Sequence, residues 1–385
     1  GQVFAVAAQI VEEEICSIED VDRGAKVGLR WAEGPFEIAN KIGIEQTIKM
    51  ATSYAELAGF QLPKWLKEKN EIFEFNYIDI EINDNIAKIK INRPEAMNAL
   101  NESVVKQLGS ALDNLNSKEN IDTIVLEGAG KAFVAGADVK FFVDKINEDS
   151  TKDIYDFTAY GHDVLNKLEK SKKTTIALTT GLALGGGLEL AMSCDYRVGT
   201  RRSQFRFPET SIGIFPGLGG TQRTPRICGI EAARYAVLAG NFLDSKTASA
   251  LGILTHLVDP SDISKTIMEI SVEGKPVNKY PGMPKDENNP VSLFAMNFYK
   301  NENMESIMSG EIPEGFEKED KTVIRQMKSL SFTAPIALKI ANQLLNDAIA
   351  TGDDLDSGLA LELAELDTIF ASKDEYVFYL SEKII

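Results

Sequence analysis

The stretch of sequence that decides the fold is residues 181–192, Gly-Leu-Ala-Leu-Gly-Gly-Gly-Leu-Glu-Leu-Ala-Met. It predicts a buried strand that ends in glycines and continues into a helix. The first N–H groups of a helix lack intrahelical partners and carry the positive end of its dipole, and glycines let a ligand approach them closely. The segment is therefore a natural pocket for an anion or a developing oxyanion, although close helix–strand packing alone would also explain it. The spacing matches neither the dinucleotide fingerprint nor the P-loop.

Two further segments on either side share this small-residue character. Residues 131–140, Lys-Ala-Phe-Val-Ala-Gly-Ala-Asp-Val-Lys, follow a predicted strand, and their small side chains leave backbone N–H groups uncovered. Residues 207–223 place Glu209 in an apolar, glycine-rich stretch. Taken alone, the segment 131–140 is also typical of a tight loop. Glu209, taken alone, could equally be a helix cap or part of an ion pair in a loop.

Glu189 lies near the start of the predicted helix, among leucine, alanine and methionine. A carboxyl group in an apolar environment has a raised pKa, which suits acid–base catalysis. A glutamate in the first turn of a helix is equally explained by the helix dipole.

The rest of the chain predicts an α/β core flanked by helices. Apolar residues alternate over 78–82 and 87–91 around a turn at 83–85, which indicates a β-hairpin. Strands at 123–127 and 174–179 then alternate with helices at 153–170 and 188–194. We expect helices over 3–15, from Ser17 onward and over 36–43, a linker over 63–74, a surface excursion with local helices over 263–331, and long helices over 334–350 and 353–371.

Composition excludes several classes of protein. The 385 residues carry a formal net charge of -17, which repels nucleic acid and anionic lipid at long range. The three cysteines, Cys16, Cys194 and Cys228, form no disulfide framework, which favours a cytoplasmic location. Their spacing with His162 and His256 suggests no metal site. No apolar run approaches the roughly 20 residues of a membrane span, and the start of the chain is not that of a signal peptide.

Together with residues 92–100, Asn-Arg-Pro-Glu-Ala-Met-Asn-Ala-Leu, the three segments resemble the enoyl-CoA hydratase/isomerase, or crotonase, superfamily. The resemblance covers about Phe75 to Val258 and resumes after Ser331. It implies a ββα spiral core with a C-terminal helical subdomain, an acyl-CoA thioester as ligand, no cofactor beyond the coenzyme A of the substrate, and a homo-oligomer, trimer or hexamer.

The resemblance also implies roles for individual residues. The backbone N–H groups of Ala137 and Gly186 would form the oxyanion hole, and Glu189 and Glu209 match the two carboxylates of hydratases. The segment around Ala135, Asp138 and Val139 would line the adenine end of the coenzyme A site.

A second resemblance concerns the N-terminal helices. Residues 20–23, Asp-Val-Asp-Arg, followed by residues 34–37, Gly-Pro-Phe-Glu, look like the closing helical part of 3-hydroxyacyl-CoA dehydrogenases. We therefore expect a helical remnant over 1–62, a linker over 63–74 and a hydratase domain over 75–385, as the C-terminal portion of a bifunctional enzyme. The NAD-binding half is missing, so dehydrogenase activity is not expected; an unrelated helical extension is the alternative.

These expectations point to an enoyl-CoA hydratase, which adds water to a 2-trans-enoyl-CoA. One alternative is an enoyl-CoA isomerase that uses Glu209 as a proton shuttle. Another is a CoA-binding or assembly subunit of a larger complex, which activity on a short 2-enoyl-CoA would exclude. The end of the chain lacks the family's usual features, and Lys383 is only a weak candidate for a contact with the coenzyme A phosphates.

Overall fold

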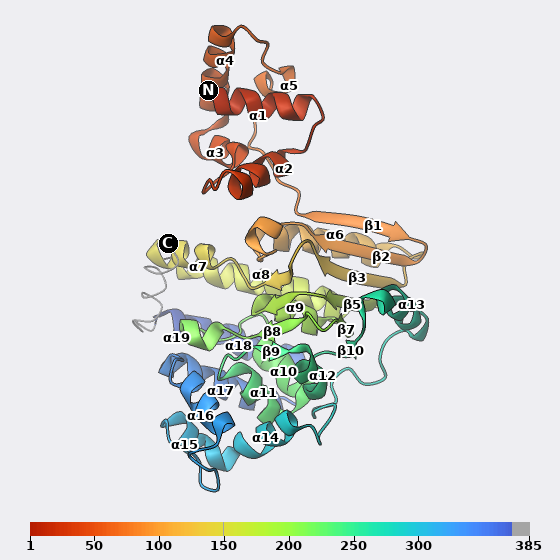
Figure 1. Ribbon diagram of the computed structural model, residues 1–385, viewed down its shortest axis with the longest axis vertical. Helices are drawn as coiled ribbons and strands as arrows, with labels where there is room; N and C mark the ends of the chain where they lie inside the picture. Colours follow the sequence, from red (N-terminus) through yellow and green to blue (C-terminus); the bar gives the residue numbers. More distant parts are fainter. Residues whose placement is uncertain (149, 372–385) are drawn as a thin grey trace. The chain divides into compact units, whose positions relative to one another are not determined.

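The computed structural model describes residues 1–148 and 150–371 and divides them into two compact units, Gly1–Tyr77 and a second that begins at Ile78 (Figure 1). Lys383 lies outside the described residues. Among the described residues, no helix combines the length and the apolar character needed to cross a bilayer.

The first unit is a small helical domain with its own core. Its elements are α1 (Gln2–Glu12), α2 (Ile18–Arg23), the π-helical turn η1 (Gly24–Gly28), α3 (Pro35–Ile42), α4 (Ile44–Ala58) and α5 (Lys64–Lys67). Ser17 caps α2 as predicted, because its side chain accepts the N–H of Asp20. The core includes Phe36, Leu66 and Phe73.

Residues 63–74 differ from the expected linker. They contain α5, and Leu66 and Phe73 are buried with the rings of Phe36 and Phe73 4.7 Å apart. The charge pattern alone does not predict this packing, because the apolar residues of the segment are dispersed among lysines and glutamates. The two units therefore divide at Tyr77, after the segment that we expected to separate them.

The two N-terminal motifs meet in space. The carboxylate of Asp22 accepts the backbone N–H of Phe36 at 2.9 Å and that of Glu37 at 2.8 Å. Glu37 in turn accepts the N–H of Gly34 at 2.8 Å. Asp22 thus fixes the start of α3, which explains physically why an acidic residue in one motif accompanies Gly-Pro-Phe-Glu in the other.

The second unit is built on two sheets. Among its described residues, six strands form a sheet in the order β1-β2-β3-β5-β7-β10, and four form a smaller sheet in the order β4-β6-β8-β9. The larger sheet comprises β1 (Ile78–Asn83), β2 (Ile86–Ile91), β3 (Thr123–Gly128), β5 (Thr174–Thr179), β7 (Tyr196–Gly199) and β10 (His256–Leu257). The smaller comprises β4 (Ala132–Ala135), β6 (Leu182–Leu184), β8 (Gln204–Arg206) and β9 (Leu243–Asp244). The predicted hairpin is antiparallel β1–β2, and β2, β3, β5, β7 and β10 run parallel.

The chain spirals between these sheets. A strand of the larger sheet is followed by a strand of the smaller one and then by a helix, as in β5, β6 and α9 (Gly186–Ser193). The other turns add α6 (Glu102–Ser117), α7 (Val139–Asn147) and α8 (Thr151–Glu169), and then η3 (Glu209–Ile212) and α10 (Gly220–Cys228). This repetition is the predicted ββα architecture.

The C-terminal part of the unit is helical. It contains α11 (Ile230–Val237), α12 (Ser245–Leu251), α13 (Ile263–Glu273), α14 (Pro290–Phe298), α15 (Met304–Met308), α16 (Lys321–Leu330), α17 (Pro335–Ala350), α18 (Leu355–Ala364) and α19 (Leu366–Ala371), with short 3-10 turns η4 (Pro260–Asp262) and η5 (Asn301–Asn303). A further 3-10 turn, η2 (Pro94–Ala96), lies between β2 and α6. Figure 1 shows α14 to α17 gathered on the side of the unit away from the β1–β2 hairpin. The segment 263–331 is more than the expected surface excursion, because Phe298 and Tyr299 within it are completely buried.

Candidate active site

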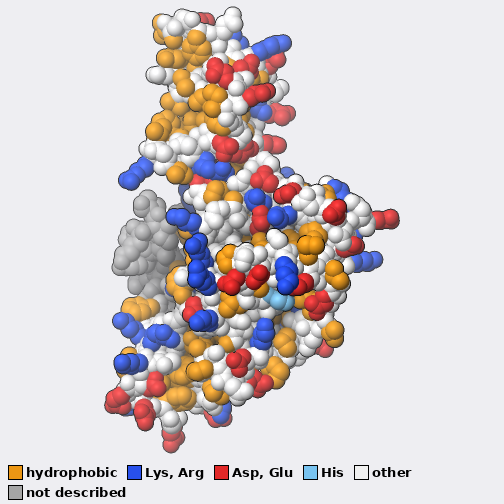
Figure 2. Space-filling view, turned by 45° about the vertical axis from the view of Figure 1, so that its right-hand side comes forward, with side chains coloured by type: hydrophobic (Ala, Val, Ile, Leu, Met, Phe, Trp, Pro, Cys, Tyr) orange, Lys and Arg blue, Asp and Glu red, His pale blue; other side chains and the backbone are white. Residues whose placement is uncertain are grey.

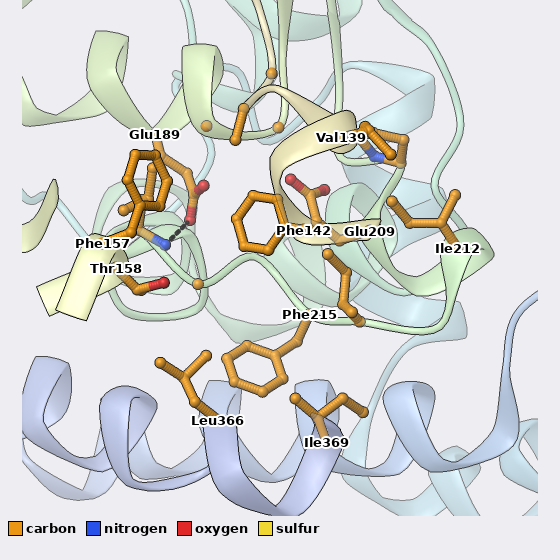
Figure 3. Close-up of a pocket in the computed structure, with 18 of the residues that line it drawn as sticks. Val139, Phe142, Phe157, Thr158, Glu189, Glu209, Ile212, Phe215, Leu366 and Ile369 are labelled. Atoms are coloured by element: carbon orange, nitrogen blue, oxygen red, sulfur yellow. Dashed lines mark hydrogen bonds between the residues drawn. The ribbon is translucent and has the colours of Figure 1, made fainter. Parts of the chain in front are cut away.

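The three small-residue segments converge on one cavity of about 180 Å³ in the second unit (Figure 3). Glu189 and Glu209 both line it, and the backbone of Ala137 and Gly186 forms another part of its wall. Apart from Thr158, the remaining side chains of the wall are apolar and include Val139, Phe142, Phe157, Ile212, Phe215, Leu366 and Ile369. A short apolar group with one polar end fits such a lining.

Glu189, on α9, accepts hydrogen bonds from the start of a second helix, α10, and from the residues before it. Its Oε1 accepts the N–H groups of Leu218 and Gly220, each at 2.7 Å, and Gly220 is the first residue of α10. Burial, the charge of Glu209 and the charge of Glu362 raise the pKa of Glu189 well above its usual value, while these two N–H groups oppose the rise. A Cβ on Gly220 would lie 2.7 Å from Oε1, so only glycine allows this contact.

Glu209 faces the cavity from η3. It is buried, and among the described residues its Oε2 has no hydrogen-bond partner. Burial raises the pKa of Glu209 to about 8, with the nearby Arg206 opposing the rise. A carboxyl group that is protonated at neutral pH and has an unpartnered oxygen is suited to donate a proton to a bound ligand.

The two predicted oxyanion donors lie side by side. A Cβ built on Gly186 would be 3.5 Å from the backbone nitrogen of Ala137. Leu100 donates to the carbonyl of Gly136 and accepts from Asp138, both at 2.9 Å, so the alternation of an extended chain turns the N–H of Ala137 to the opposite side. Gly186 begins α9, where an N–H has no intrahelical acceptor. Gly185 supplies the sharp turn with φ +47°.

The residues around Asn98 hold the Ala137 segment in place. The buried amide of Asn98 accepts the N–H of Arg93 at 2.9 Å and donates to the carbonyls of Ala129, Ala132 and Phe133. Asn98 itself has φ +60°, which asparagine tolerates better than most residues. The motif at 92–100 therefore serves as a structural brace for β4.

Of the three residues expected at the adenine end, Ala135 and Val139 line the cavity. Asp138 is not among the described residues that line it. Its carboxylate pairs with Arg93 at 2.9 Å and caps α7 by accepting the N–H of Lys140. A role of Asp138 in binding coenzyme A stays a prediction.

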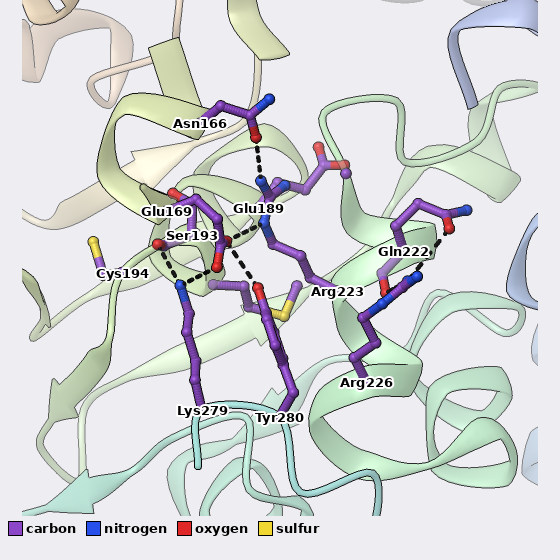
Figure 4. Close-up of polar contacts among 12 residues, drawn as sticks. Asn166, Glu169, Glu189, Ser193, Cys194, Gln222, Arg223, Arg226, Lys279 and Tyr280 are labelled. Atoms are coloured by element: carbon purple, nitrogen blue, oxygen red, sulfur yellow. Dashed lines mark hydrogen bonds and ion pairs between the residues drawn. The ribbon is translucent and has the colours of Figure 1, made fainter. Parts of the chain in front are cut away.

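A buried polar network lies behind α9 (Figure 4). Arg223 donates to the carbonyl of Leu218 at 3.1 Å and pairs with Glu169 at 3.0 Å. Lys279, from the segment expected to be a surface excursion, donates to Glu169 at 2.8 Å and to the carbonyl of Ser193, at the end of α9, at 2.7 Å. The helix that carries Glu189 is therefore fixed at its far end by the excursion.

Sequence reasoning missed Glu362 on α18, a buried carboxyl group whose charge acts on both Glu189 and Glu209. A signal for it was present: Glu362 stands in Leu-Glu-Leu-Ala over 361–364, the same tetrapeptide that surrounds Glu189 over 188–191. The adjacent leucines do not themselves bury Glu362, since Leu361 is exposed and neighbouring residues of a helix point in different directions.

The described residues contain no group of three or more His, Cys, Asp or Glu arranged to hold a metal ion. On the face shown in Figure 2, acidic and basic side chains are interspersed, so the net charge of -17 is not gathered there into one patch.

The fold and the site define a crotonase-type protein, and comparison with known proteins agrees. Residues 86–377 match the family described as enoyl-CoA hydratase/isomerase, and the chain belongs to that family. It is 36% identical over 199 residues to a short-chain-enoyl-CoA hydratase of Clostridium acetobutylicum, covering 51% of this chain and 75% of that one. It is 34% identical over 198 residues to a crotonyl-CoA hydratase of Syntrophomonas wolfei, with the same coverage.

A solved structure confirms the predicted fold. The crystal structure of an enoyl-CoA hydratase from Rhodobacter sphaeroides superposes with a TM-score of 0.67 at 20% identity, covering 80% of this chain and 90% of that one. At this identity the likeness concerns the fold, including its helical C-terminal region.

Proposed function

We propose that this protein is an enoyl-CoA hydratase that adds water reversibly to a 2-trans-enoyl-CoA to give a 3-hydroxyacyl-CoA. One observation carries the proposal: two buried carboxyl groups, Glu189 and Glu209, line the same apolar cavity next to the backbone N–H groups of Ala137 and Gly186. The hydratases among its relatives support the same reaction.

The proposed reaction begins with the thioester carbonyl in the oxyanion hole. Hydrogen bonds from Ala137 and Gly186 stabilise the negative charge that develops on this oxygen as water attacks C3. Glu189, held by two N–H groups, orients the water and takes its proton, and Glu209 delivers a proton to C2. The hydroxyl and the hydrogen then stand on neighbouring carbons, and return of one proton from Glu189 to Glu209 restores the starting state.

These groups supply carbonyl polarisation and proton transfer, so we propose no cofactor beyond the coenzyme A that the substrate carries. Ala135 and Val139 are proposed to contact the coenzyme A, in keeping with their place in the cavity wall. We further propose a cytoplasmic homo-oligomer, a trimer or hexamer, on the resemblance to the family.

The first unit is proposed to be the closing helical part of a 3-hydroxyacyl-CoA dehydrogenase, which would make the chain part of a bifunctional enzyme. The joining of its two motifs through Asp22 supports this proposal. We propose no hydride transfer by these residues.

The test is loss of enoyl absorbance when the purified protein is mixed with crotonyl-CoA. Glu189→Gln and Glu209→Gln should each reduce kcat by a factor of about 10²–10⁴, the usual contribution of a general acid or base. Glu119→Gln, on an exposed loop, is the matched control and should leave kcat unchanged. A wild type without turnover, or turnover indifferent to both glutamates, would reject the proposal and direct attention to isomerase substrates or a binding role.

A further inference from the structure

Glu362 and Glu189 both accept hydrogen bonds from the same short segment, residues 218–221. The N–H of Gly219 donates to Oε1 of Glu362 at 2.5 Å, while the N–H groups on either side of it, Leu218 and Gly220, donate to Glu189. The hydroxyl of Thr221 donates to Oε2 of Glu362. Three consecutive amides therefore alternate between two buried carboxyl groups, so a shift of the segment at Glu362 moves the donors of Glu189.

His162 on α8 contacts both Glu362 and Gly217, the residue before this segment. Its Nε2 lies 2.7 Å from the carbonyl of Gly217 and 3.2 Å from Oε1 of Glu362. Because both neighbours are acceptors, the hydrogen-bond geometry assigns a proton to Nε2. A Cβ on Gly161 would lie 2.6 Å from Leu218, so α8 packs directly on this segment.

We propose that Glu362 is a positioning residue for hydration: through the amides of residues 218–220 it sets the place and the charge environment of Glu189. The inference rests on the proposed function and deepens it. Glu362 does not line the cavity, and it therefore acts through the segment and through its charge.

The charge of Glu362 acts on a defined set of neighbours. It raises the pKa of both Glu189 and Glu209, each of which is raised mainly by burial. The charged and titratable groups that face it are His162 on α8, Glu189 on α9, Glu209 on η3 and Arg223 on α10. Neutralising Glu362 while keeping its shape should make both catalytic carboxyl groups more acidic.

Two substitutions separate position from charge. Glu362→Gln keeps an oxygen for the N–H of Gly219, and its amide can donate to the hydroxyl of Thr221. We expect nearly wild-type kcat at the optimum, with the pH profile of kcat displaced to lower pH by about one unit. Glu362→Ala removes the hydrogen bonds from Gly219 and Thr221. It should lower kcat by about 10²-fold with little change in KM, because a misplaced catalytic group costs that much.

Further measurements keep the test independent of folding and of the proposed reaction. Thr221→Val keeps the shape of the side chain but removes the hydrogen bond that the hydroxyl donates to Glu362 and the one that it accepts from Gln222, and it should lower kcat less than Glu362→Ala. Glu365→Gln, just beyond the end of α18, is the matched control. Hydrogen exchange of the peptide that contains residues 217–221 should be faster in Glu362→Ala, whether or not crotonyl-CoA is hydrated.

The outcomes distinguish the two proposals. Absence of turnover in the wild type overturns the hydratase assignment. Hydrogen exchange then decides whether Glu362 holds residues 218–220 in place. If Glu362→Ala is folded and shows unchanged hydrogen exchange in residues 217–221, the proposed positioning of this segment by Glu362 is refuted. If Glu362→Gln has the pH profile of the wild type, the influence of its charge on the site is refuted. Should Glu362→Ala fail to fold, Thr221→Val and Glu362→Gln give the answer.

Discussion

The proposed oxyanion hole consists of main-chain groups, and an added methyl group can test it. In Gly186→Ala the added Cβ would stand 3.5 Å from the backbone nitrogen of Ala137, in the space proposed for the thioester oxygen. The nearest atom otherwise is Cδ1 of Leu218 at 3.1 Å, a side-chain end that can yield slightly. The substitution should therefore leave the fold intact and keep the carbonyl from its donors.

The expected loss is that of an oxyanion donor, about 10²–10³-fold in kcat, or about 3–4 kcal/mol of transition-state stabilisation. The assay is crotonyl-CoA hydration, with circular dichroism and Tm to confirm folding. Gly24→Ala, where a Cβ has open space around it, is the control and should leave kcat unchanged. A folded Gly186→Ala protein with wild-type kcat/KM would refute the assignment of this hole.

Two further predictions concern acid–base state and stability. Because Glu209 is proposed to donate in its protonated form, kcat should fall as pH rises through about 8, the raised pKa of this carboxyl group; a kcat that stays level well above that pH would argue against the role. Asn98→Ala should lower the free energy of unfolding by about 2–4 kcal/mol, since it leaves buried carbonyl groups unpaired, whereas Asn288→Ala on an exposed turn should change it little in the same denaturant titration.

Local patterns predicted much of the fold because their causes are local. The β1–β2 hairpin follows from apolar alternation around a turn at 83–85, and the cap at Ser17 from a side chain that reaches its own helix. The buried strand expected over 174–179 coincides with β5, and all six of its residues are buried in the structure. The long helix expected over 353–371 is instead two, α18 and α19.

What could not be predicted depends on contacts between distant parts of the chain. Lys279 is one of many lysines in a polar segment, and only folding places it against the end of α9. Tyr299 is followed by the polar residues Lys-Asn-Glu-Asn over 300–303, yet it is fully buried. Glu362 and His162 are 200 positions apart (362 minus 162) and meet only in the folded protein. Spacing along the sequence carries no record of such pairs.

The contact between α9 and β4 has a consequence for how this enzyme could be altered. A Cβ on Gly187 would stand 2.0 Å from the carbonyl of Val134, so helix and strand touch without any side chain between them. The spacing of the two proposed donors is then set by peptide geometry and by no rotamer. Substitution of cavity-lining side chains such as Phe142 and Phe215 should therefore change the room for the acyl group without altering the main-chain spacing of the two proposed donors.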